Sequence, residues 1–264
     1  MLKISTHVAQ GNVREYMEDR VYTGRLKLGP YPSWDVVAVM DGHGGYQAAE
    51  YCREHLADGL KGLYQSHGDR WTDHLTELFE DLNQRIAQTT ESGTTLSLFL
   101  HRQGQVVCAN VGDSHIYGFA PDEAGVLVPR RVSCSHKHSL KRESQRLKEA
   151  DRKFTIEDDY LTVPSGHQLA MTRALGDRAF GELVSAVPYV SHPGSQYRVF
   201  VVASDGLWDV LDRPQLMQDF VKRLQRPRST AAKLNRWRLK HFEQHDNTSV
   251  VVIKLPQTPA AEFK

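Results

Sequence analysis

The stretch Trp34–Met40 (WDVVAVM) runs directly into residues 41–45 (DGHGG). The first part is a short apolar run, which is typical of a strand buried on both faces. The glycines that follow allow backbone amides and carbonyls to approach a ligand closely. Residues 44–65 then carry apolar side chains at helical spacing with charged side chains between them. The segment therefore predicts a strand, a tight loop and an amphipathic helix in succession.

The rest of the chain carries more strand signals than helix signals. Further helices are predicted over residues 71–88 and from Pro214, where proline suits a first turn, through Leu224. Strands are predicted over residues 94–100, 106–111, 115–120, 126–132, 197–203 and 248–255. Many hairpin-spaced strands with few long helices favour an α+β fold with antiparallel sheets over a βαβ repeat.

The composition is that of an ordinary globular protein. The chain has 264 residues, of which 40% are hydrophobic and 25% charged, which argues against disorder and fibrous classes. With 33 Lys and Arg against 32 Asp and Glu, the formal charge of +1 supplies no bulk attraction to nucleic acid or to an anionic membrane. The sequence shows neither a run of the roughly 20 apolar residues that a membrane helix needs nor the apolar part of a secretory signal. We therefore expect no nucleic-acid partner and no membrane association.

The cysteines and the charge pattern suggest how the chain is organised. Cys52, Cys108 and Cys134 are widely spaced and form neither a disulfide framework nor a CxxC zinc motif, so we expect free thiols and a cytoplasmic location. We expect one domain over residues 1–255, a frayed tail over 256–264, and a monomer. Residues 139–164 are strongly charged, and a solvated helix followed by a mobile loop is the simplest interpretation.

Acidic residues recur where the predicted strands begin or end. Glu18 and Asp19 open an early strand, and Asp41 follows the strand Trp34–Met40. The other acids at such positions are Asp113, Asp205, Asp209 and Asp246. Each Asp-Gly pair, taken alone, is a common turn dipeptide. The apolar strands just before Asp41 and Asp205 make turns alone the poorer explanation for the whole set.

A group of converging carboxylates has a consequence for ligand binding. Several carboxylates in one cleft cannot all stay ionised unless cations compensate their charge. The ligand set contains only oxygen donors and no Cys/His cluster, so the cations would be hard ones, Mn²⁺ or Mg²⁺. Two such ions that share a carboxylate could polarise a water and clamp a phosphoryl group.

Two further residues near the acids could take part in phosphate chemistry. His43 stands in the glycine loop after Asp41, where a side chain with a pKa near working pH could donate a proton to a leaving alkoxide. Arg14, shortly before Glu18, could bind phosphate with both arms of its guanidinium. The plainer alternatives are a helix-capping or surface histidine, among 13 in the chain, and an ordinary surface arginine.

These motifs, taken in order, resemble a known family. The pieces are residues 14–19 (REYMED), 41–45 (DGHGG), 92–95 (SGTT), 110–114 (NVGDS), 172–177 (TRALGD), 204–209 (SDGLWD) and 246–249 (DNTS). The sequence resembles the metal-dependent, type 2C protein serine/threonine phosphatases over nearly its whole length. The resemblance implies a four-layer α-β-β-α sandwich of two antiparallel sheets flanked by helices, and a phosphoprotein substrate in the pathway of a serine/threonine kinase.

The resemblance also implies roles for residues at matching positions. Asp41 would bridge two Mn²⁺ or Mg²⁺ ions. The remaining implied metal positions are Glu18, the carbonyl of Gly42 and, in the water shell, Asp19 at one ion, Asp205 and Asp246 at the other, and Asp113, Asp205 and Asp209 at a weaker third. Arg14 would hold the substrate phosphate, His43 would be the general acid, and a bridging hydroxide would attack phosphorus in line without a phosphoenzyme intermediate. Asp177 would be supporting structure, a loop acid satisfied by backbone amides.

The sequence departs from the family pattern in three places. Residues 135–138 read SHKH where relatives commonly carry DHKP, His115 stands where they carry arginine, and residues 139–168, which correspond to the variable flap, have their own charge pattern. A binding module that recognises phosphorylated partners without turnover therefore stays open beside an active phosphatase. A third hypothesis is a two-metal hydrolase of another phosphate ester, such as a nuclease, which the near-neutral charge of the chain disfavours.

Overall fold

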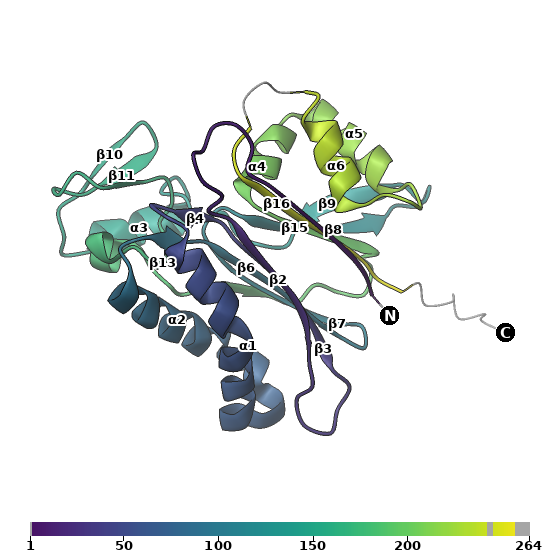
Figure 1. Cartoon of the computed structure of the whole chain (residues 1–264), viewed down its shortest axis with the longest axis horizontal. Helices are drawn as coiled ribbons and strands as arrows, with labels where there is room; N and C mark the ends of the chain where they lie inside the picture. Colours follow the sequence, from purple (N-terminus) through teal and green to yellow (C-terminus); the bar gives the residue numbers. More distant parts are fainter. Residues whose placement is uncertain (1, 242–244, 257–264) are drawn as a thin grey trace.

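Two five-stranded antiparallel sheets form the centre of the computed structural model, which describes residues 2–241 and 245–256 (Figure 1). Most of the expected tail, 256–264, lies outside the described residues. The first sheet has the order β14-β7-β6-β3-β2. Its strands are β2 (Arg20–Leu26), β3 (Trp34–Met40), β6 (Leu96–Arg102), β7 (Gln105–Val111) and β14 (Tyr189–Ser191).

The second sheet packs against the first and has the order β1-β16-β15-β8-β9. Its strands are β1 (Lys3–Ala9), β8 (His115–Pro121), β9 (Leu127–Arg131), β15 (Val199–Ala203) and β16 (Thr248–Lys254). Strands β16 and β15 pair with Val250 opposite Ala203, and β15 pairs with β8 with Ala203 opposite His115. This register brings the segments around residues 113, 205 and 247 to one end of the sandwich.

Helices cover the outer face of each sheet, which gives the four-layer α-β-β-α sandwich (Figure 1). The first sheet is covered by α1 (Gln47–His67) and α2 (Leu75–Thr89), joined by the 3₁₀ segment η1 (Gly68–His74). The second sheet is covered by α4 (Asp205–Trp208), η3 (Val210–Asp212), α5 (Pro214–Leu224) and α6 (Ala231–Arg238). The expected fold class is confirmed.

Strand alternation explains why three apolar layers form. In β3, Val36, Ala38 and Met40 belong to the core beneath the α1–α2 layer. Val37 and Val39 point the other way, into the core between the two sheets. That central core includes Phe99 and Phe200, whose ring centroids lie 4.9 Å apart. The run of buried residues in β3 therefore reflects a strand with an apolar layer on each side.

Several small elements lie beside the sandwich at its acid-rich end. The flap contains α3 (Lys141–Glu149) and a small sheet of β10 (Thr155–Glu157), β11 (Tyr160–Thr162) and β12 (Gln168–Leu169). A second small sheet joins β4 (Gly42–His43), β5 (Gly93–Thr94) and β13 (Leu175–Gly176), and η2 (Arg178–Leu183) follows it. The flap packs on its own apolar cluster, which includes Leu147, Leu161 and Phe180.

The predicted helices and strands agree with the structure except in detail. The helix predicted over 71–88 begins at Leu75, because Trp71 lies in η1 with its ring edge-on to Trp34. The charged segment 139–164 contains the expected helix, but the interpretation of that helix as simply solvated is wrong, because Glu143 is fully buried. Among residues 2–241 and 245–256, no helix combines the length and the apolar composition needed to cross a bilayer.

Candidate active site

The predicted acids meet at one end of the sandwich because each lies at a strand end on that side. Asp41 follows β3, and the backbone N–H of Thr95 donates to its carbonyl oxygen at 2.9 Å. Arg20 pairs with Met40 in the sheet, so Asp19 lies beside Asp41. The other acids arrive from the ends of β7, β15 and β16, at positions 113, 205, 209 and 246.

Asp41 lies at the centre of the acid cluster. Burial raises the pKa of its carboxyl well above the ordinary value, and the charges of Asp205, Asp19 and Asp113 raise it further. The Ser114 hydroxyl donates to one carboxylate oxygen at 3.3 Å. The cluster therefore holds more negative charge than its own hydrogen bonds can neutralise.

Asp19 is held between the two sheets and is only 1% exposed. The Ser204 hydroxyl donates to its Oδ2 at 2.8 Å, and the backbone N–H of Ser249 donates to that hydroxyl oxygen at 2.9 Å. Its Oδ1 is buried and has no hydrogen-bond partner among the described residues. Burial is the main reason that the pKa of Asp19 rises to about 6.

Asp205, Asp209 and Asp113 form the other side of the cluster. Burial, followed by the charges of Asp113 and Asp209, raises the pKa of Asp205 to about 8. Burial also raises the pKa of Asp113, although the ammonium of Lys137 lies 3.8 Å from its Oδ2 and acts in the opposite direction. Within the described part of the chain, Asp113 Oδ1 is buried without a hydrogen-bond partner.

The cluster fits hard divalent cations. Its donors are all oxygens, which Mg²⁺ and Mn²⁺ prefer. Burial and mutual repulsion raise the pKa values of Asp41, Asp19 and Asp205, and divalent charge would remove that repulsion. Two buried carboxylate oxygens, one on Asp19 and one on Asp113, have no hydrogen-bond partner among residues 2–241 and 245–256, so they can accept a cation or its water shell.

Glu18 and Gly42 lie on the side of the cluster nearest the glycine loop. The backbone N–H of Gly45 donates to Glu18 Oε1 at 2.6 Å, and the N–H of Glu18 donates to the Asn247 side-chain oxygen at 2.7 Å. A Cβ atom on Gly42 would lie 2.6 Å from the carbonyl oxygen of Glu18, so only glycine fits there. No role was predicted for Asn247 or Ser204, although both stand directly beside predicted ligands.

Arg14 does not stand free in the structure. Its guanidinium pairs with Asp246 through two contacts, Nε to Oδ1 at 2.8 Å and Nη2 to Oδ2 at 3.0 Å. The arginine side chain is 49% exposed, so the pair lies at the rim of the cluster. The structure thus joins a predicted phosphate ligand to a predicted metal ligand, which the sequence did not suggest.

His43 faces Asp177 across the small β4-β5-β13 sheet. Its Nε2 lies 2.9 Å from each carboxylate oxygen of Asp177, so the Nε2–H hydrogen bond is shared between the two oxygens. Burial lowers the pKa of His43, but the charge and hydrogen bond of Asp177 outweigh it and raise the pKa overall. The expectation that backbone amides satisfy Asp177 is therefore wrong, because its partner is His43. A Cβ atom on Gly93 would lie 2.3 Å from both His43 Nε2 and Asp177 Oδ2, which explains the glycine between them.

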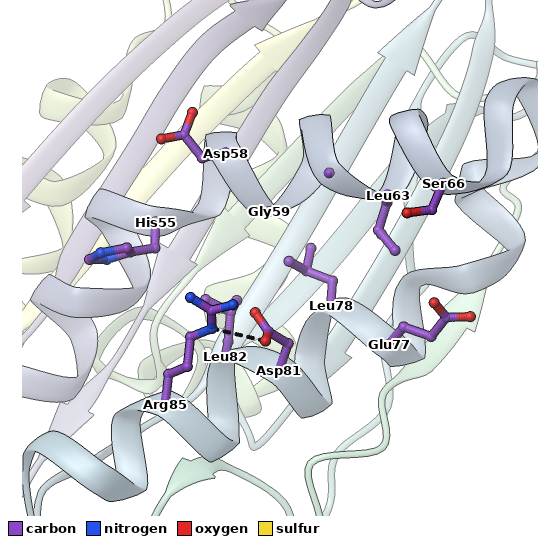
Figure 2. Close-up of a pocket in the computed structure, with 11 residues that line it drawn as sticks. His55, Asp58, Gly59, Leu63, Ser66, Glu77, Leu78, Asp81, Leu82 and Arg85 are labelled. Atoms are coloured by element: carbon purple, nitrogen blue, oxygen red, sulfur yellow. Dashed lines mark hydrogen bonds and ion pairs between the residues drawn. The ribbon is translucent and has the colours of Figure 1, made fainter.

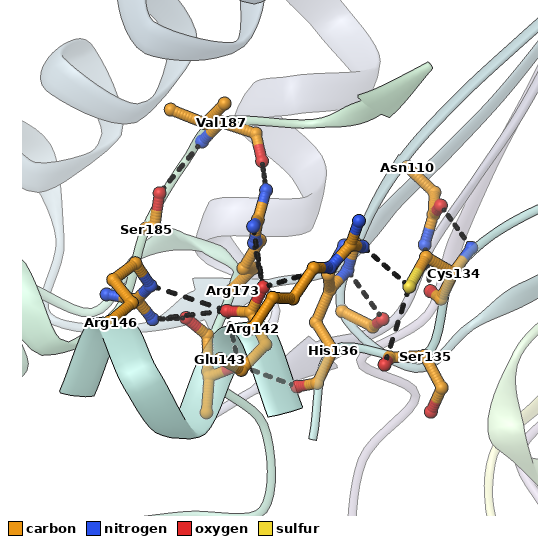
Figure 3. A network of polar contacts seen from close by, with 12 residues as sticks. Asn110, Cys134, Ser135, His136, Arg142, Glu143, Arg146, Arg173, Ser185 and Val187 are labelled. Atoms are coloured by element: carbon orange, nitrogen blue, oxygen red, sulfur yellow. Dashed lines mark hydrogen bonds and ion pairs between the residues drawn. The ribbon is translucent and has the colours of Figure 1, made fainter. Parts of the chain in front are cut away.

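A buried carboxylate ties the flap to the segment that carries Asp177 (Figure 3). Glu143 on α3 accepts from Arg173 Nε at 2.9 Å and from the Thr172 hydroxyl at 3.0 Å. Arg146, one turn later, donates to the carbonyl oxygen of Thr172 at 2.8 Å. Burial raises the pKa of Glu143, but Arg173 and its neighbours lower it overall, so the group is held as a carboxylate.

Two histidines near the segments that depart from the family pattern are packed into the structure: His115, which departs from it, and His136, which matches it. His115 is buried, its Nδ1 lies 3.3 Å from the Ser133 hydroxyl, and burial lowers its pKa to about 3. His136 is buried with Nδ1 3.2 Å from the Gly112 carbonyl oxygen, and burial lowers its pKa to about 3 as well. Both rings therefore stay neutral near pH 7 and leave the acid cluster intact.

A groove elsewhere is unrelated to this chemistry. It lies between α1 and α2 and is lined by Leu63, Leu78 and the Arg85–Asp81 ion pair, among others (Figure 2). None of the predicted site residues, all of which the structure describes, contributes to it. The acid cluster is therefore the candidate active site.

The fold and the site together define a class: a four-layer α-β-β-α protein with a carboxylate cluster, a histidine and an arginine at one end of the sandwich. Comparison with known proteins then identifies the family. The sequence model of protein phosphatase 2C matches residues 5–246, and the chain belongs to this family.

Individual relatives agree with that assignment. The chain is 33% identical over 236 residues to "Protein phosphatase 2C homolog 1" of Schizosaccharomyces pombe, a match covering 84% of this chain and 64% of that protein. It is 29% identical over 266 residues to the protein of the same name in Saccharomyces cerevisiae, covering 92% and 89%. The solved serine-threonine phosphatase 2C from Toxoplasma gondii has the same fold, with a TM-score of 0.83, 18% identity, and coverage of 97% of this chain and 95% of that chain. The chain thus spans less than two thirds of its Schizosaccharomyces relative.

Proposed function

We propose that the protein hydrolyses phosphoserine and phosphothreonine in proteins with Mn²⁺ or Mg²⁺, by direct attack of water on phosphorus without a phosphoenzyme intermediate. The observation that carries the proposal is the buried position of Asp41 among Asp19, Asp113 and Asp205, whose charges raise its pKa. Repulsion among these carboxylates lowers the stability of the folded chain. Clusters of carboxylates with strongly raised pKa values are typical of functional sites.

The metal would be held by the acids in the arrangement that the family resemblance implies. Asp41 would serve two ions, with Glu18 and the Gly42 carbonyl on one side and Asp205 and Asp246 on the other; Asp19 would hold water, and Asp113 and Asp209 would suit a weaker third ion. When bound, such ions supply a polarised water and positive charge for the phosphoryl oxygens.

Arg14 would orient the substrate. Its pairing with Asp246 shows that the guanidinium reaches the cluster with both arms of its fork. Two oxygens of a phosphate can accept from the guanidinium fork as the two oxygens of a carboxylate do, so Arg14 would exchange Asp246 for two phosphate oxygens. That exchange would leave Asp246 available as a metal ligand.

His43 would protonate the leaving oxygen of the serine or threonine. Asp177 fixes the ring by its two contacts at 2.9 Å, and its charge and hydrogen bond raise the pKa of His43, which favours the protonated ring that a general acid needs. An alkoxide is a poor leaving group, and proton donation to it removes the charge that develops as the P–O bond breaks. We also propose that residues 1–255 act as one catalytic domain, with residues 139–168 as its flap.

Hydrolysis of a phosphothreonine peptide with added Mn²⁺ tests the proposal. Wild-type protein should release phosphate, and a chelator should stop the release. Asp205→Asn should lower kcat/KM by at least about a hundredfold, because a neutral amide cannot replace the charged carboxylate ligand that is lost. Asp58→Asn, which removes an exposed acid on α1 paired with Lys61, is the matched control and should leave activity unchanged. No phosphate release by wild-type protein in excess Mn²⁺ would refute the proposal. Cleavage of DNA by the same preparation would favour the nuclease alternative.

A further inference from the structure

Positive charge is segregated in one part of the chain. Residues 220–241 contain eight Lys and Arg residues and no Asp or Glu, although the whole chain is nearly balanced at 33 against 32. The eight are Lys222, Arg223, Arg226, Arg228, Lys233, Arg236, Arg238 and Lys240. This stretch spans the end of α5 and all of α6, on the outer face of the second sheet (Figure 1).

Five basic side chains in this stretch surround one cavity. The cavity has a volume of about 290 Å³ and is lined by Arg223, Lys233, Arg236, Trp237, Lys240 and His241. We call it the α5–α6 basic pocket. No carboxylate among the described residues lines it, so its walls present hydrogen-bond donors and positive charge.

The cations of the pocket lack the partners that other surface cations have. Arg25 pairs with Asp35 and Arg85 pairs with Asp81, both at 2.9 Å. Arg236 and Lys240, in contrast, make no side-chain hydrogen bond or ion pair with any residue in 2–241 or 245–256. The Lys233 ammonium donates to the Arg228 carbonyl oxygen at 2.9 Å and pairs with no carboxylate among the described residues.

Two buried donors at the pocket also lack acceptors. Arg223 packs over the Trp237 ring, with its Cζ 5.3 Å from the ring centroid. Its Nε and the indole Nε1 of Trp237 are both buried without a hydrogen-bond partner in the described part of the chain. The pocket itself is lined by cationic side chains, of which Arg236 and Lys240 have no ion-pair partner among the described residues, and such a lining favours an anion.

We propose that the α5–α6 basic pocket binds a phosphate group on an acidic segment of a phosphoprotein, as a docking site separate from the catalytic cluster. Arginine and lysine side chains match phosphate oxygens, and the cavity is large enough for a phosphate group and part of its side chain. Its role in substrate selection rests on the proposed phosphatase function, while the binding itself does not.

The position of α6 makes such docking relevant to catalysis. Arg238 lies on the buried side of α6 and donates through Nη1 to the Gly206 carbonyl oxygen at 2.9 Å. Gly206 directly follows Asp205, so a hydrogen bond joins α6, which bears the pocket, to α4, which begins at Asp205. A segment bound in the pocket would therefore be held in a fixed relation to the acid cluster.

Two other anionic partners fit the pocket less well. Trp237 is only 5% exposed, so its ring face is not available to stack on a nucleic-acid base. Within the described residues 213–241, Leu239 alone is a large apolar side chain that is exposed, because the apolar side of α6 is buried in the core. A membrane-surface helix needs a wide exposed apolar face, which α6 lacks.

Binding of a labelled peptide with two phosphoserines in an acidic sequence tests the proposal, measured by fluorescence anisotropy with chelator present so that no turnover occurs. The triple variant Lys233→Gln, Arg236→Gln, Lys240→Gln should bind about tenfold more weakly, because three charged contacts to phosphate are lost. The control is Lys61→Gln, Arg70→Gln, Arg85→Gln, which removes the same charge from exposed side chains elsewhere and should bind as wild type. All six side chains lie on the surface, and unchanged melting temperatures confirm folding.

Several outcomes would overturn the proposal. The first is that wild type and the pocket variant bind the peptide with equal affinity. The second is that both triple variants weaken peptide binding equally. The third is that the pocket variant loses more affinity for RNA or for anionic vesicles than for the phosphopeptide. A turnover measurement in Mn²⁺ separates docking from catalysis: the pocket variant should keep wild-type kcat/KM on an aryl phosphate and lose about tenfold on the peptide. Parallel loss on both substrates would also contradict docking. If wild type turns over neither substrate, the proposed function fails, whereas the result in chelator still decides the pocket.

Discussion

Replacing Asp205 by asparagine should raise the stability of the metal-free protein while it abolishes phosphatase activity. Burial and the charges of Asp113 and Asp209 raise the pKa of Asp205 to about 8 in the folded chain. An unfolded aspartate has a pKa of about 3.9. The folded state therefore binds this proton more tightly than the unfolded state does, and the free energy of unfolding falls steadily as the pH rises from about 4 to about 8.

The size of the effect follows from these pKa values. At pH 7 the difference spans about three pH units, or about 4 kcal/mol at 1.36 kcal/mol per unit. Asparagine remains buried and keeps part of the desolvation cost, so a gain of about 2 kcal/mol is expected. For a chain of this size that corresponds to a melting temperature about 4–8 °C higher.

Thermal melts in chelator, at pH 7.5 and at pH 4, measure this effect directly. The gain from Asp205→Asn should be present at pH 7.5 and nearly absent at pH 4, where the carboxyl of the unfolded chain is also about half protonated. Added Mn²⁺ should stabilise wild type more than the variant, because bound cations remove the repulsion. Asp58→Asn, which changes an exposed acid, should move the melting temperature by less than about 1 °C. A lower melting temperature for Asp205→Asn in chelator at pH 7.5 would refute the account of the cluster as repulsive without metal.

The remaining predictions concern the groups around the cluster. His43→Ala should slow hydrolysis of a phosphothreonine peptide far more than that of an aryl phosphate, since only the alkyl leaving group needs a proton; equal slowing in steady-state assays would exclude the acid role. Gly93→Ala should lower kcat with modest change in KM, because the added Cβ would stand 2.3 Å from both His43 Nε2 and Asp177 Oδ2, and kinetics like wild type would show that this contact is not required. Glu143→Ala should destabilise the fold by about 3–5 kcal/mol in urea denaturation, since the fully buried Glu143 would leave Arg173 without its partner; a loss under about 1 kcal/mol would contradict the network.

The main strands of the fold could be predicted from local pattern, and the exceptions have physical causes. Trp34–Met40 was evident because a strand with an apolar layer on each side reads as an uninterrupted apolar run. Lys3–Ala9 was not predicted, because this edge strand is largely exposed and polar and takes its place by pairing with β16 at the far end of the chain. Trp71 fits the period of the following helix, yet its packing on Trp34 holds it in a 3₁₀ turn.

The composition of the candidate site could be anticipated more readily than its pairings. Acids at strand ends are visible in the sequence, and the structure brings Asp41, Asp205 and their neighbours together as predicted. The contacts of Arg14 with Asp246 and of His43 with Asp177 join residues 232 and 134 positions apart, and no local pattern encodes them. The buried Glu143 was hidden for the same reason, since its partner Arg173 comes from a different part of the fold.

Anomalous diffraction from crystals soaked in Mn²⁺ tests the central claim most directly. The account predicts two strong manganese peaks in contact with Asp41, one also near Glu18 and the Gly42 carbonyl oxygen, the other near Asp205 and Asp246. Manganese absent from Asp41 at saturating concentration, or bound only at surface carboxylates such as Asp58, would contradict it.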